Sequence, residues 1–142
     1  MSSLSPSSSA LLQLLRSAWL YTVLWVSWFT ILWFLSNAPL PAPPIQPQIP
    51  IDKVLHWGYY GIGGALSCFA LLAWRRAPRL TAGAVEFLLI VGFCVGWLDE
   101  WHQSWYEFRS GNDMGDLIAD CVGTYCGVKV AALLWHRWLS PR

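Results

Sequence analysis

The chain has 142 residues, of which 56% are hydrophobic and only 12% are charged. Soluble domains usually carry about 25% charged residues, so this composition and the 11 tryptophans indicate an integral membrane protein. The formal net charge is +1 and the basic residues lie near the ends of apolar segments, a pattern that argues against nucleic-acid binding.

The first apolar segment lies close to the N-terminus. Residues 1–16 begin with a serine-rich stretch and are predicted to form a disordered tail. The run Ala18–Leu35 is long enough to cross a hydrocarbon core of about 30 Å. A secretory signal is the competing interpretation, because Ser36, Asn37 and Ala38 loosely resemble a cleavage site. The run is too long and too rich in tryptophan for a signal, which favours an uncleaved anchor helix.

A proline-rich segment separates this run from three more. Prolines recur between Asn37 and Pro50, so we expect an extended loop there, because proline breaks helices. Further apolar runs of membrane-spanning length follow at 52–74, 81–101 and 116–138. The sequence therefore predicts an all-α fold with a single domain, residues 17–142, in which four transmembrane helices joined by short loops form a bundle.

Small residues in the last two runs suggest where these helices pack. The pairs Gly92-x-x-x-Gly96 and Gly123-x-x-x-Gly127 have a spacing that lets helices approach closely in lipid. Four cysteines all fall inside apolar runs, which is poor placement for disulfides, so we interpret them as small packing residues.

The basic residues predict the orientation of the helices. Arg16, then Arg75, Arg76 and Arg79, and then Arg137 with Arg142 mark alternate ends of the four runs. The positive-inside rule therefore predicts that both termini and the middle loop are cytoplasmic. The proline-rich loop and the last loop should then be external. Most of the acidic residues belong to that external side: Asp52, Asp99, Glu100, Glu107, Asp113, Asp116 and Asp120.

This topology should bring three polar clusters to one face of the membrane. The first comprises Asp52, Lys53 and His56, the second comprises Asp99, Glu100, His102 and Gln103, and the third comprises Arg109, Asp113, Asp116 and Asp120. Taken alone, the first cluster also fits an ordinary helix start, with Asp52 as a cap. Ionisable groups at membrane depth are expensive, so together they indicate a polar pocket that binds a ligand or catalyses a reaction.

Asp120 is the residue that ordinary helix capping explains least. Asp113, Asp116 and Asp120 share one helical stripe, and Asp120 should lie about 6 Å deeper than Asp116. Such a carboxylate needs a cationic side chain, a hydrogen-bond donor, a proton or a metal ion. Candidate ligands for a divalent metal are Asp99, Glu100, Asp116 and Asp120.

Three motifs resemble the VanZ-like family of small bacterial membrane proteins. They are Asp52-Lys53-x-x-His56, Gly96-x-x-Asp99-Glu100-x-x-Gln103 and a long one from Arg109-Ser110-Gly111 through Asp113, Asp116 and Asp120 to Gly123 and Gly127. The resemblance covers residues 51–127 and implies a multi-pass protein of the bacterial cytoplasmic membrane. That family is named for an accessory protein of teicoplanin resistance. Its members usually carry Asn where this chain has Asp120.

Three functions remain open from the sequence. The first is a cell-envelope accessory protein whose external pocket binds a lipid-linked precursor, a lipid headgroup or a glycopeptide. The second is a membrane-embedded hydrolase or transferase, in which a metal ion activates water and Arg109 holds the phosphate of a lipid substrate. The third is a structural bundle in which the polar residues form an ion-pair latch. In each case the lipid bilayer is the expected surrounding of the chain.

Overall fold

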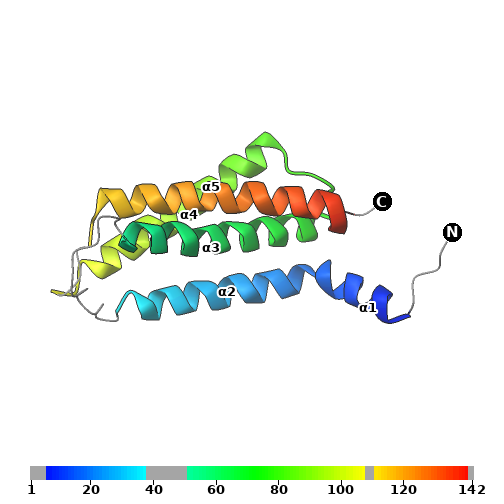
Figure 1. Cartoon of the computed structure of the whole chain (residues 1–142), viewed down its shortest axis with the longest axis horizontal. Helices are drawn as coiled ribbons and strands as arrows, with labels where there is room; N and C mark the ends of the chain where they lie inside the picture. The colour runs from blue at the N-terminus through cyan, green and yellow to red at the C-terminus, as the bar shows by residue number, and fades with distance from the viewer. Residues whose placement is uncertain (1–5, 38–50, 108–110, 141–142) are drawn as a thin grey trace.

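A computed structural model describes residues 6–37, 51–107 and 111–140, and every regular element in these ranges is a helix (Figure 1). The all-α prediction is thus confirmed for the described residues. The proline-rich loop and Arg109, both prominent in the sequence, lie outside them. The elements are α1 (Pro6–Leu15), α2 (Ala18–Leu35), α3 (Ile51–Arg75), α4 (Ala82–Gln103), α5 (Met114–Leu134) and the π-helical turn η1 (Trp135–Leu139).

A helix occupies much of the segment that was expected to be a disordered tail. α1 covers Pro6–Leu15, and its first residue is a proline, which suits a helix start because its fixed φ angle is already helical. Leu11, Leu12, Leu14 and Leu15 give the second half of this segment an apolar character that the serine-rich beginning conceals.

Local side chains define where the long helices begin and end. The hydroxyl groups of Ser17 and Thr81 accept the backbone N–H of Leu20 and Ala84, which caps α2 and α4. Asp113 caps α5 in the same way, because its carboxylate accepts the N–H of Gly115 at 2.7 Å. α3 ends differently.

The end of α3 is a left-handed cap. Arg76 has a φ angle of 47°, and its N–H donates to the carbonyl of Ala73. The N–H of Ala77 reaches back to the carbonyl of Leu72 at 3.1 Å, which completes a Schellman-type closure. Pro78 then prevents the helix from resuming.

α3 lies at the centre of the arrangement and contacts α2, α4 and α5 (Figure 1). α3 and α5 run in the same direction. α4 runs in the opposite direction and connects the end of α3 to the start of α5. The α3–α5 contact is very close. A Cβ atom added to Gly127 would lie 1.9 Å from the carbonyl oxygen of Gly61, and one added to Gly123 would lie 2.2 Å from that of Trp57. Only glycine permits this approach of two backbones.

The core changes character along the helices. Toward the end that carries the N- and C-terminal helices it is aliphatic and aromatic, and its buried members include Cys68, Leu72, Leu88, Val128 and Trp135. In the middle, Trp28, Leu32 and Tyr60 form a second hydrophobic cluster. At the opposite end, where α2 and α4 finish and α3 and α5 begin, the buried side chains are polar.

The outward faces are apolar, as expected for a protein in a lipid bilayer. Large side chains such as Trp19, Phe34, Ile90 and Leu133 are exposed, and they would face water in a soluble protein. Three described segments are long and apolar enough to cross a membrane: Ala18–Leu35, Ala82–Gln103 and Met114–Leu139. α3 is not among them, although its 25 residues would suffice in length.

The α3–α5 contact generates a stability prediction. Gly127→Ala forces a Cβ atom against the backbone of α3, so we expect a loss of about 1–3 kcal/mol or more in the free energy of unfolding. Thermal unfolding in detergent, followed by tryptophan fluorescence, measures it. Gly58→Ala is the matched control, because a Cβ atom at Gly58 meets nothing within 4 Å and alanine favours the helix. Equal unfolding temperatures for both variants would contradict the prediction.

Candidate functional site

The described members of the three predicted polar clusters, which do not include Arg109, meet at the end of the molecule where α3 and α5 begin. α3 supplies the first cluster, the last turns of α4 supply the second, and α5 with its cap supplies the third. We call this group the polar site, and its described members are Asp52, Lys53, His56, Asp99, Glu100, Gln103, Asp113, Asp116 and Asp120. Most of these side chains are buried, whereas Asp52 is exposed. Glu107, which was also assigned to this side, is exposed and lies outside the group.

Lys53 ties α3 to the start of α5. Its Nζ atom lies 2.9 Å from Asp113 Oδ2 and 2.9 Å from Asp116 Oδ1, and a longer contact of 3.5 Å reaches Asp52. The hydrogen bond from Lys53 lowers the pKa of the Asp113 carboxyl below its usual value, and the N–H of Gly115 adds to the effect. Asp113 is therefore both the cap of α5 and an ionised partner of Lys53.

His56 pairs with the deepest carboxylate of the site. Its Nδ1 atom lies 2.9 Å from Oδ1 of Asp120, a residue that is 0% exposed. Asp120 fits there because Gly96 faces it, and a Cβ atom on Gly96 would lie only 2.8 Å from Asp120 Oδ2. The Gly92-x-x-x-Gly96 pair thus makes room for side chains of α5, since Gly92 faces Thr124 in the same manner.

Asp99 belongs to a separate network that connects three helices. Its carboxylate accepts hydrogen bonds from Ser36 at the end of α2, from Tyr60 at 3.4 Å and from Gln103 at 3.1 Å. The sequence predicted Asp99 and Gln103 as site residues, whereas Ser36 and Tyr60 were not predicted. Tyr60 follows His56 by four residues, so its helical spacing could have placed it on the same face.

Glu100 joins the helix α4 to the turn before α5. Its Oε2 atom accepts the backbone N–H of Asp113 at 2.7 Å, and its own carbonyl accepts the N–H of Asn112 at 3.3 Å. The side chain is buried, and its second oxygen, Oε1, has no hydrogen-bond partner among the described residues. Asp120 Oδ2 is also buried without a hydrogen-bond partner among the described residues. Buried acceptors of this kind cost free energy unless something satisfies them.

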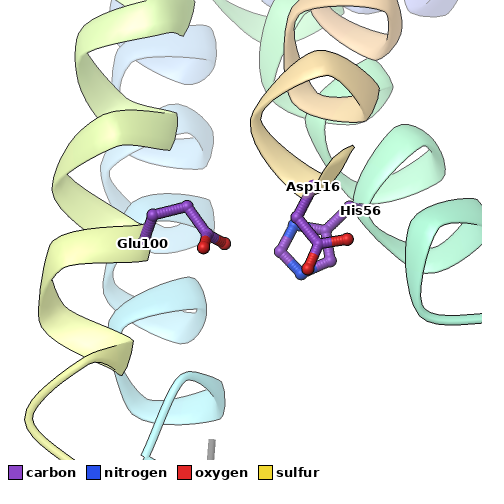
Figure 2. Close-up of side chains that lie close together, drawn as sticks. All are labelled: His56, Glu100 and Asp116. Atoms are coloured by element: carbon purple, nitrogen blue, oxygen red, sulfur yellow. The ribbon is translucent and has the colours of Figure 1, made fainter. Parts of the chain in front are cut away.

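Three of these side chains, from three helices, converge on one point. Figure 2 shows the carboxylate of Glu100 reaching from α4 toward Asp116 and His56 on the opposite side. Each of the three residues offers one atom that could bind a metal ion, and these three atoms all lie within 4.8 Å of one another. A second group of the same kind consists of Asp52, Asp113 and Asp116, but there the ammonium group of Lys53 already bonds to all three.

His102 is buried near the polar site but faces aromatic rings. Its imidazole stacks on Trp33 with ring centroids 3.7 Å apart and meets Trp105 and Tyr106 edge-on. The sequence predicted His102 as a member of the second polar cluster, whereas its ring packs among aromatic side chains. The stacking of His102 on Trp33 packs the end of α4 against the end of α2 beside the polar site.

The comparisons with known proteins give no family for this chain. No protein-family model, no curated protein and no solved structure matches it.

The Lys53 contacts generate a second prediction. Lys53→Met leaves the buried carboxylate of Asp116 without its cation, so we expect a loss of about 1–3 kcal/mol in the free energy of unfolding. Thermal unfolding in detergent measures the change. The double variant Lys53→Met/Asp116→Asn should regain part of the loss because no unpaired charge remains. Lys129→Met, which removes an exposed lysine elsewhere on α5, is the control, and an equal effect there would contradict the role of Lys53.

Proposed function

We propose that α2, α3, α4 and α5 form a four-helix transmembrane bundle with both termini in the cytoplasm and the proline-rich loop outside. The segregation of charge supports this orientation, because Arg75, Arg76 and Arg79 lie at the end opposite the polar site. Arg16 lies at that same end and donates from Nε to the carbonyl of Leu139 at 2.9 Å. The length of α3, 25 residues, and its contacts with α2, α4 and α5 support including it as the fourth spanning helix.

Cysteine labelling tests the orientation. The four native cysteines are first replaced by alanine or serine, and single cysteines are then introduced at Glu107 and at Arg76. A membrane-impermeant maleimide should label position 107 in intact cells and position 76 only after permeabilisation. The reverse pattern would place the polar site in the cytoplasm and overturn the proposed orientation.

Within this topology, we propose that the chain is a VanZ-like accessory protein of the bacterial cell envelope, whose polar site binds the phosphate-bearing headgroup of a membrane lipid or lipid-linked precursor. The motifs shared with that family support the assignment, and both Asp52-Lys53-x-x-His56 and Asp99-Glu100-x-x-Gln103 fall within the polar site. The observation that carries the proposal is the buried Glu100 Oε1, which has no partner in the described residues.

A purely structural latch accounts less well for this oxygen. The contacts of Lys53 with Asp113 and Asp116, and those of Asp99 with Ser36 and Tyr60, have the satisfied geometry of a latch. A latch gains nothing from a buried carboxylate oxygen that remains unpaired, because such a group destabilises the fold. A binding site, in contrast, keeps such an oxygen available for a hydrogen-bond donor of its ligand or for a cation that accompanies the ligand.

A hydrolase or transferase acting on the same phosphate-bearing lipids is the second candidate. The observation that favours it is the convergence of His56, Glu100 and Asp116, which are groups able to hold a metal or transfer a proton. The two candidates differ in what happens to the lipid. An accessory protein releases it unchanged, whereas an enzyme releases phosphate or transfers it.

Lipid binding by the purified protein tests the proposed function. Native mass spectrometry in detergent uses three phosphate-bearing lipids as probes: undecaprenyl phosphate, phosphatidylglycerol and phosphatidylcholine. At least one of them should be retained, and Glu100→Gln should weaken its binding at least tenfold. Glu107→Gln, an exposed residue of the same charge, serves as the control. Cells that produce the protein should also tolerate more teicoplanin than cells that lack it. Absence of lipid retention together with unchanged tolerance would refute the proposal.

A further inference from the structure

The charge balance of the polar site bears on what it binds. The buried carboxylates of the site belong to α4 and α5. Among the described residues, the lysine that contacts these buried carboxylates is Lys53, which bonds to Asp116. A phosphate group approaching Glu100 and Asp116 directly would meet charges of its own sign. A cation between the carboxylates and the phosphate removes this conflict. Lys53 supplies one positive charge beside Asp116, so the lipid headgroup of the proposed function requires a further positive charge beside Glu100.

Glu100 is placed to bind such a cation. The residue is 3% exposed, and its Oε2 atom is held by the backbone N–H of Asp113. This hydrogen bond fixes the carboxylate while Oε1 remains unpartnered, and the side chain points toward Asp116 and His56 (Figure 2). The unpaired oxygen is independent of the clustering itself, because a cluster closed by internal hydrogen bonds would have none.

His56 is oriented as a metal ligand usually is. A histidine that binds a metal through one ring nitrogen commonly donates the N–H of the other ring nitrogen to a carboxylate. This hydrogen bond fixes the tautomer of the ring and raises the basicity of the ligating nitrogen. The contact of His56 Nδ1 with Asp120 at 2.9 Å is of this kind and leaves Nε2 as the ring's other donor atom. In this arrangement Asp120 is a positioning residue rather than a ligand.

The spacing suits a metal of moderate size. Ligand atoms at about 2.0–2.2 Å from one ion lie about 3–4 Å from each other. The ligand atoms of His56, Glu100 and Asp116 lie within 4.8 Å, so small side-chain movements bring them to these distances. One imidazole and two carboxylates suit Zn²⁺ or Mn²⁺ better than Ca²⁺ or Mg²⁺, which prefer oxygen ligands alone. Three protein ligands also leave a position open for a phosphate oxygen.

We propose that His56, Glu100 and Asp116 bind one divalent transition-metal ion, and that Asp120 orients His56 toward it. This inference rests on the proposed function for the identity of the further ligand, a phosphate oxygen of the lipid, but the metal site itself does not. It replaces the metal candidates expected from the sequence in two ways. Asp99 is engaged with Ser36, Tyr60 and Gln103, so His56 takes its place as a ligand. Asp120 changes from an expected ligand to the residue that positions His56.

Metal titration of the full-length protein in detergent tests the proposal. After EDTA treatment and its removal, Zn²⁺ and Mn²⁺ are titrated, and elemental analysis counts the bound ion. We expect one ion per chain, which raises the unfolding temperature. Glu100→Gln and His56→Gln should abolish this binding, and Asp120→Asn should weaken it by about 10–100-fold. No bound ion, or equal affinity in Glu100→Gln and the native chain, would overturn the proposal.

Two matched variants locate the ion within the site. Asp52→Asn should leave the affinity unchanged, because Asp52 belongs to the neighbouring group around Lys53. Loss of binding in Asp52→Asn with retention in Glu100→Gln would move the ion to that group and overturn the assignment. Glu107→Gln controls for a general change in charge at this end, and size-exclusion profiles show whether each variant remains folded.

Lipid binding measured with and without EDTA separates this inference from the proposed function. Retention of undecaprenyl phosphate that EDTA abolishes and Zn²⁺ restores supports both. Retention that EDTA does not affect leaves the proposed function standing and overturns the metal site as its means of holding phosphate. Stoichiometric metal binding without lipid retention, together with unchanged teicoplanin tolerance, supports the site and refutes the function.

Discussion

The close contact between α3 and α5 is the constraint on which the rest of the structure depends. The backbones touch where Gly127 meets Gly61 and where Gly123 meets Trp57, and there the two parallel helices cannot slide without a clash. This fixed register sets His56 beside Asp120 and Lys53 beside Asp116, roughly one to three turns nearer the helix starts than the Gly61–Gly127 contact. Polar geometry at one end is thus determined by glycines in the apolar middle.

The parallel direction of these helices also has an electrostatic effect. Both α3 and α5 begin at the polar site, so the positive ends of both helix dipoles point toward its carboxylates. α4 ends there and brings a negative end, together with Asp99 and Glu100. Asp99 is compensated by neutral donors from Ser36, Tyr60 and Gln103, whereas Glu100 receives one backbone N–H. This difference separates a structural carboxylate from one that is available to a ligand.

The sequence predicted the long helices well because their signals are local. The apolar runs at 18–35, 52–74 and 81–101 agree within about two residues with α2, α3 and α4, since length, proline and capping residues act nearby. α1 was missed because its serines suggested disorder. The convergence of three polar clusters on one end followed from alternating helix directions alone, without knowledge of any contact.

The division of roles within the polar site could not be predicted. Spacing placed Asp99, Glu100, Asp116 and Asp120 together as equivalent metal candidates, and their differences arise from partners distant in sequence. Ser36 reaches Asp99 across 63 residues and His56 reaches Asp120 across 64. Such contacts depend on helix rotation and register, which the glycine contacts determine and a hydrophobic pattern does not.

The connection between α3 and α5 has a consequence for biosynthesis. Parallel neighbours need a return crossing, and α4 provides it, so α3 emerges from the ribosome well before the helix against which it packs. Until α5 is made, Lys53 and His56 lack their carboxylate partners, and Glu100 lacks the N–H of Asp113. A chain truncated before α5 should therefore display a half-built polar surface to membrane quality control, and only the last helix converts it into a closed site.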